Sequence, residues 1–68
     1  MTVLYAVETN ASIGTTQIIA AEALGFWPGM NESGRLGTEV YLDEEGAGKV
    51  EARLTELGYQ VFVTRHSG

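Results

Sequence analysis

Residues Thr2 to Thr9 alternate in the manner of a β-strand, and both faces created by this alternation are apolar. One face carries Val3, Tyr5 and Val7, and the other carries Leu4 and Ala6. A strand that is apolar on both faces belongs inside a sheet, with helices or a partner subunit covering each face. We therefore expect this strand to be the central one.

A helix is predicted to begin near Ser12 to Thr15 and to end at Gly25, which supplies a typical C-cap. Gln17 and Glu22 form its only polar strip beyond the first turn. So narrow a strip indicates burial on most sides. The following segment, 25–37, contains four glycines and no periodicity, so we expect a long loop.

A second alternating run, Thr38–Leu42, leads into an amphipathic helix and then into a third strand over Tyr59–His66. Asp43 is expected to cap this helix, and Gly58 is expected to end it. Its apolar stripe, at helical spacing, consists of Ala47, Val50, Leu54 and Leu57.

The order of elements predicts one domain over residues 1–68 with an α/β fold, β-α-β-α-β. Right-handed crossovers favour a three-stranded parallel sheet with strand one central and one helix on each face. The competing arrangement is an α+β, incomplete ferredoxin-like sandwich. It places both helices on one face and adds a short strand within residues 29–37.

Nine acidic and four basic residues give the chain a formal charge of −5, which opposes binding to nucleic acid or anionic lipid. There is no cysteine and only one histidine, so disulfides and the usual zinc sites are excluded. We expect no cofactor, no metal and no membrane contact, and we expect a cytoplasmic protein. A domain this small buries only about 60% of its unfolded surface, which favours self-association as reinforcement.

Two patterns suggest chemistry but fail as sites. The Gly46-Ala47-Gly48-Lys49 run lacks the spacing of a phosphate loop, and two glutamates precede it. The carboxylates of Glu39, Asp43, Glu44 and Glu45 do not follow a calcium-loop pattern, and acids at a helix start have a local role there. We therefore expect a protein that is not an enzyme.

The best small-ligand candidate is the turn between the first strand and the first helix, where hydroxyls and free amides gather. Its residues are Asn10, Ser12, Gly14, Thr15 and Thr16. All of them are also suited to capping a helix, whether or not an anion binds.

The candidate partner-binding surface consists of Phe26, Trp27, Met30 and Tyr41, because aromatic and methionine side chains are enriched at interface cores. Phe26 and Trp27 have an alternative role in closing the end of the core. The leading hypothesis is a regulatory module that docks on another protein or on a second copy of itself. The alternatives are an anion binder at the first turn and an acidic inhibitor that imitates nucleic acid.

Overall fold

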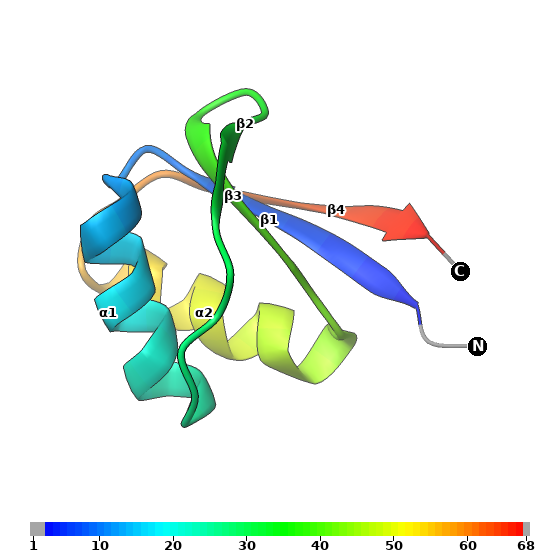
Figure 1. Ribbon diagram of the computed structural model, residues 1–68, viewed down its shortest axis with the longest axis horizontal. Coiled ribbons are helices and arrows are strands. Elements are labelled where there is room, and N and C mark those ends of the chain that lie inside the picture. The colour runs from blue at the N-terminus through cyan, green and yellow to red at the C-terminus, as the bar shows by residue number, and fades with distance from the viewer. Residues whose placement is uncertain (1–2, 68) are drawn as a thin grey trace.

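The computed structural model describes residues 3–67, which form one four-stranded sheet and two helices (Figure 1). The strands are β1 (Leu4–Thr9), β2 (Asn31–Ser33), β3 (Gly37–Leu42) and β4 (Val61–Ser67), and the helices are α1 (Ile13–Leu24) and α2 (Glu44–Glu56). The strand order is β2-β3-β1-β4, and all neighbours are antiparallel. The fold class is therefore α+β. Thr2, at the start of the first predicted strand, lies outside the described residues.

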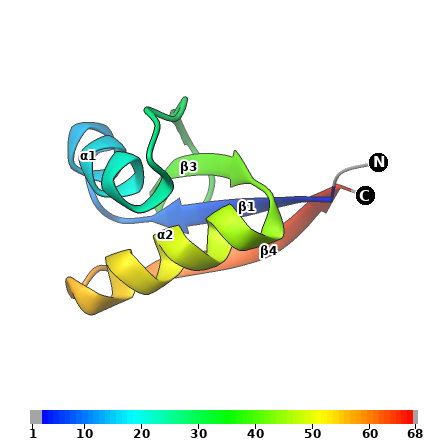
Figure 2. The same ribbon diagram turned by 90° about the horizontal axis from the view of Figure 1, so that it is seen from below.

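The predicted α/β arrangement is wrong in three respects. The sheet has four strands, because 31–33 in the predicted loop pairs with 37–39. This β2–β3 hairpin reverses the chain, so β3 runs antiparallel to β1 rather than parallel to it. Both helices lie on one face of the sheet rather than one on each (Figures 1 and 2). The competing α+β arrangement included one-sided helices and an extra strand within 29–37.

Strand β1 lies inside the sheet, between β3 and β4, as its apolar pattern predicts. Val7 faces the helices and is aligned with Val40 on β3 and Val63 on β4. Ala6 faces the other way and is nevertheless buried, with Tyr41 and Thr64 as its cross-strand partners. Neighbouring side chains thus cover this small residue, and a second layer is not needed to keep it dry.

The core lies between the sheet and the two helices. Helix α2 buries Ala47, Val50 and Leu54, as its stripe predicts, whereas Leu57 follows the last helical turn and is exposed. Helix α1 adds Ile19 and Ala20 to the same cluster.

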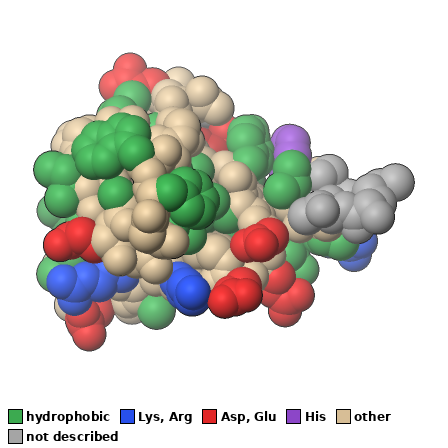
Figure 3. All heavy atoms as spheres, turned by 60° about the horizontal axis from the view of Figure 1, so that its bottom comes forward, with side chains coloured by type: hydrophobic (Ala, Val, Ile, Leu, Met, Phe, Trp, Pro, Cys, Tyr) green, Lys and Arg blue, Asp and Glu red, His purple; other side chains and the backbone are tan. Residues whose placement is uncertain are grey.

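Helix α1 is exposed along one stripe, which consists of Gly14, Ile18 and Glu22, and its other residues are buried or partly buried. The predicted burial on most sides therefore holds except that the apolar Ile18, 55% exposed, lies on the exposed stripe. Figure 3 shows hydrophobic side chains at the surface among polar and charged ones.

The predicted helix ends are confirmed. The Ser12 hydroxyl accepts from the Thr15 amide at 3.2 Å, and the Asp43 carboxylate accepts from the Gly46 amide at 2.8 Å. Gly25 ends α1 with φ +86°, a left-handed conformation that glycine adopts at little cost. On the outer face of α2, Glu45 pairs with Lys49 at 3.2 Å.

Candidate functional site: a cleft at the edge of the sheet

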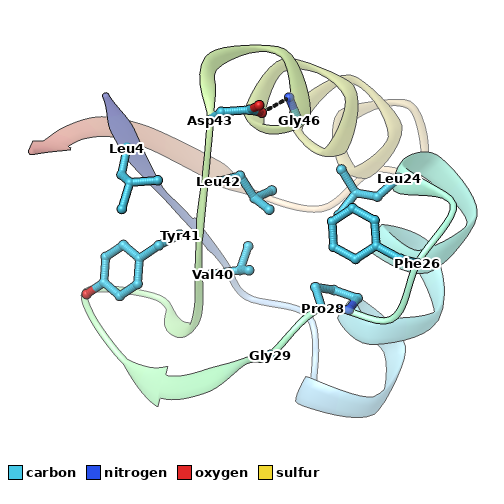
Figure 4. Close-up of a pocket in the computed structure, with 10 residues that line it drawn as sticks. All are labelled: Leu4, Leu24, Phe26, Pro28, Gly29, Val40, Tyr41, Leu42, Asp43 and Gly46. Carbon is cyan, nitrogen blue, oxygen red and sulfur yellow. Dashed lines mark hydrogen bonds between the residues drawn. The ribbon is translucent and has the colours of Figure 1, made fainter. Parts of the chain in front are cut away.

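A cleft of about 350 Å³ opens where the outer edge of β3 meets the segment that follows α1 (Figure 4). We call it the edge cleft. It is lined by Leu4, Leu24, Phe26, Pro28, Gly29, Val40, Tyr41, Leu42, Asp43 and Gly46. Most of these side chains are apolar, so the cleft combines hydrophobic walls with an accessible strand edge.

The edge of β3 is open here because β2 is short. Among residues 3–67, β2 pairs with β3 only from Gly37 to Glu39, so Val40–Leu42 has a strand partner on the β1 side alone. In an antiparallel strand, alternate residues direct N–H and C=O groups to each side. Some backbone groups of this stretch therefore face the cleft instead of another strand.

The chain before β2 is held away from this edge. Pro28 has no N–H group with which to extend the β2–β3 ladder. Its side chain is buried, and its carbonyl accepts a hydrogen bond from Gln17 Nε2 on α1 at 3.4 Å. These contacts anchor the segment to the helix layer and preserve the gap beside β3.

The two sides of β3 give the cleft two kinds of wall. Figure 4 shows Val40 and Leu42 directed toward Leu24, Phe26 and Pro28, while Tyr41 points to the opposite side of the strand. Leu4 lies on that second side with Tyr41. Apolar surface is thus available on both sides of the open backbone edge.

The predicted partner-binding residues are partly brought together. Phe26 and Tyr41 both line the edge cleft and are 59% and 37% exposed. Trp27 is 63% exposed and follows Phe26 in the chain without lining the cleft. Met30 is partly buried and packs against the core. The alternative in which Phe26 and Trp27 close the core is wrong, because both side chains face solvent.

Sequence reasoning missed the cleft residues Leu4, Leu24 and Pro28. Leu24 and Leu4 have the pattern of ordinary core residues, and nothing local shows that a gap will form beside them. Pro28 is the one residue whose type indicates the open edge, because a proline before a short strand stops that strand from extending.

Of the predicted small-ligand residues, Asn10 and Ser12 lie between β1 and α1, and Gly14, Thr15 and Thr16 lie in the first turn of α1. Several of their side chains have structural partners. Asn10 Oδ1 accepts from the Gln60 amide at 3.0 Å, and Ser12 caps α1. Thr16 is buried, and Gly14 is exposed. The neighbouring hollow includes Glu32, whose charge disfavours an anion. These contacts favour the edge cleft as the candidate site, and ligand binding at the turn stays a prediction.

The acidic residues near β3 divide between two locations. Glu39 is on the sheet face that lacks helices, directly opposite Glu8 of β1, whereas Asp43 caps α2. Among residues 3–67, no group of three or more His, Cys, Asp or Glu side chains is arranged to hold a metal ion.

Glu8 and Glu39, which face each other on the helix-free face of the sheet, each accept a hydrogen bond. Glu8 Oε2 accepts from the Arg35 amide at 2.5 Å, and Glu39 Oε1 accepts from the Tyr41 hydroxyl at 2.9 Å. The bond to Glu39 raises the pKa of Tyr41, and partial burial and the charges of Glu39 and Glu8 add to this shift. The guanidinium group of Arg35 lies 4.9 Å from the ring centre of Phe62.

Comparisons with protein families, curated proteins and solved structures find no match to this chain. In the described part of the chain, neither helix has the length and apolar character needed to cross a membrane.

Proposed function

We propose that this chain is a non-enzymatic binding module that docks a protein partner at the edge cleft. The observation that carries the proposal is an apolar cleft that opens beside an unpaired stretch of β3 and is flanked by exposed aromatic side chains. Concave apolar surface with a few convergent polar groups is the usual character of a binding site. The order β-α-β-β-α-β also supports a ferredoxin-like description of the fold.

Phe26 and Trp27 are the expected anchors of the interface. Aromatic residues dominate the binding energy of interfaces, and both side chains are already accessible in the free protein. If docking covers the exposed part of Phe26, about 120 Å² leaves water, which is worth up to about 3 kcal/mol before binding costs. We therefore expect Phe26→Ala to weaken docking at least tenfold.

The non-enzymatic part of the proposal rests on the lack of suitable groups. One histidine and no cysteine offer little for nucleophilic or acid–base catalysis. The absence of cysteine also keeps a reducing compartment, the cytoplasm, as the expected setting.

The test begins with a phage library of random twelve-residue peptides, selected on the biotinylated protein. Enriched peptides without tryptophan are synthesised, and their binding is followed through the fluorescence of Trp27, the only tryptophan in the chain. The matched control for Phe26→Ala is Phe62→Ala, because Phe62 is 46% exposed on the helix-free face and does not line the cleft.

We expect at least one peptide whose affinity falls tenfold or more with Phe26→Ala and less than threefold with Phe62→Ala. Circular dichroism and thermal melting show whether each variant is folded. The proposal is overturned if no peptide is enriched, or if both variants have the same effect on every enriched peptide.

A further inference from the structure

We infer that the partner segment binds by adding an extended strand to the edge of β3 along Val40–Leu42. This inference rests on the proposed function and specifies its binding mode. Strand addition provides affinity through main-chain hydrogen bonds and specificity through pockets for alternate side chains. Both requirements are present here, since an unpaired backbone stretch lies directly beside an apolar cleft.

The walls of the edge cleft predict the side chains of this segment. Successive residues of an added strand point to opposite sides of the sheet. One set would face Leu24, Phe26 and Pro28, and the other set would face Leu4 and Tyr41 (Figure 4). The segment is therefore expected to carry apolar residues at alternate positions on the helix side and an apolar or aromatic residue on the other side.

Charge at one end of the cleft predicts a basic residue in the partner. Asp43 lines the cleft and is followed by Glu44 and Glu45, all of them exposed. Glu45 is paired with Lys49 on α2, and Glu44 lines a separate hollow with Tyr5 and Val63, which leaves Asp43 to set the charge at this end. A lysine or arginine near Asp43 would complement this charge.

A second copy of the chain fits this edge poorly. If two β3 strands paired antiparallel about Tyr41, Asp43 of each copy would lie opposite Glu39 of the other. Like charges directly opposite each other destabilise a strand pair. The outer side of Glu39 is also already occupied by Asn31 of β2. A separate basic and apolar segment avoids the charge repulsion, and it can end beside Val40, before it reaches β2.

The other edge of the sheet, along β4, is longer but has fewer features for recognition. Its last described side chains are Thr64, Arg65 and His66, and these three residues line none of the hollows described above. The ring of His66 packs against that of Tyr41 at an interplanar angle of 38°, with ring centres 4.3 Å apart. The β4 edge also borders a hollow, of about 210 Å³, in which Val63 lies with Tyr5, Glu44, Ala47, Gly48 and Glu51. That hollow is smaller and has two glutamates in its lining, whereas the β3 cleft has Asp43 as its only charged lining residue.

The experiment uses the tightest Phe26-dependent peptide from the selection. Each backbone amide of the peptide is N-methylated in turn, which removes one hydrogen-bond donor at a time. Strand addition predicts that affinity falls at least tenfold at every second position of the paired stretch and changes much less at the positions between. Amide hydrogen exchange of the protein should slow at one or more of Val40–Leu42 when the peptide is bound.

A charge-swap arm tests the basic residue. Asp43→Asn keeps a good helix cap while removing the charge. It should weaken a lysine-containing peptide about threefold and should leave the same peptide with glutamine in place of lysine unchanged. Equal effects on the two peptides would contradict the predicted contact.

Strand addition is overturned if N-methylation at every position leaves the affinity of the peptide unchanged, or if amide exchange slows at β4 instead of β3. It is also overturned if amide exchange at Val40–Leu42 slows with protein concentration in the absence of peptide, which would assign the edge to a second copy. A peptide that depends on Phe26 but shows no alternation would refute strand addition and leave the docking proposal standing. Failure to obtain any Phe26-dependent peptide would refute both.

Discussion

Replacing Gly34 by alanine tests the turn that joins β2 to β3. Gly34 begins the turn between β2 and β3 with φ +77°. A Cβ atom added there would lie 2.9 Å from both Cδ and Oε2 of Glu8 and 3.1 Å from Oε2 of Glu39. The backbone conformation and the two carboxylates therefore both oppose a side chain at this position.

The expected cost has two parts. A left-handed conformation costs a non-glycine residue about 1 to 2 kcal/mol. Glu8 must also move away and weaken its bond from the Arg35 amide, a charged hydrogen bond worth about 1 kcal/mol at this exposed site. Gly34→Ala should thus lower the free energy of unfolding by about 2 to 3 kcal/mol, out of a total of about 3 to 10 kcal/mol for a domain of this size.

Gly25→Ala is the matched control, because Gly25 has φ +86° and an added Cβ would meet no atom within 4 Å. It should cost only the backbone part, about 1 to 2 kcal/mol. Urea unfolding of both variants, alone and combined with Glu8→Ala, isolates the carboxylate contact. In the Glu8→Ala background most of the difference between the two glycine substitutions should disappear, and what remains is the contact of the added Cβ atom with Glu39 Oε2. Equal losses in the wild-type background would refute this arrangement of the turn.

Two other predictions test the cap of α2 and the titration of Tyr41. Asp43→Ala should lower the free energy of unfolding by about 1 kcal/mol and Asp43→Asn by much less, because only alanine removes the acceptor for the Gly46 amide. Urea unfolding measures both losses, and equal losses would contradict the capping role. The raised pKa of Tyr41 means that the folded state favours the neutral hydroxyl, which donates to Glu39. The stability that this hydroxyl contributes is therefore present below pH 10 and is lost as the pH rises above it. The difference in melting temperature between wild type and Tyr41→Phe should therefore shrink from pH 9 to pH 11, and a constant difference would count against the bond to Glu39.

The local signals in the sequence were sufficient for the helices and for the position of β1. Ser12, Asp43 and Gly25 act in capping as predicted, because capping depends on residues within one turn of the chain. The two-sided apolar pattern of β1 correctly places it inside the sheet. The same pattern wrongly suggested helices on both faces, because cross-strand neighbours can bury an alanine without a second layer.

Strand direction could not be predicted once β2 was missed. The residues of β2 are Asn31, Glu32 and Ser33, which lack an apolar alternation, and their pairing depends on β3 rather than on their own pattern. Leaving out one strand of a hairpin reverses the direction assigned to the next, so the antiparallel sheet appeared parallel. Gly34 and Gly37, on either side of the turn, have positive φ angles, which glycine adopts more readily than other residues. They are two of the four glycines within residues 25–37.

The candidate site could be predicted only in part, because a cleft is a property of several segments together. The aromatic side chains of Phe26 and Tyr41 indicate a binding surface in the sequence, and the structure places both beside the open edge. Leu24 and Pro28 become part of the site only because Pro28 is held against α1 while β3 continues past the end of β2. That gap depends on the tertiary packing of three segments, and no periodic pattern in the sequence indicates it.

Exposed hydrophobic side chains alone would not single out a docking surface, because isolated ones are common on soluble domains. Ile18 and Leu57 are exposed to an extent comparable with Phe26, but neither lines the edge cleft. Phe26 differs because it lies beside unpaired backbone groups that only a hydrogen-bonding partner or water can satisfy. A partner that covered Ile18 or Leu57 would gain apolar contact alone, whereas one that covered Phe26 would gain a strand ladder as well. This combination is the physical reason for assigning docking to the β3 edge.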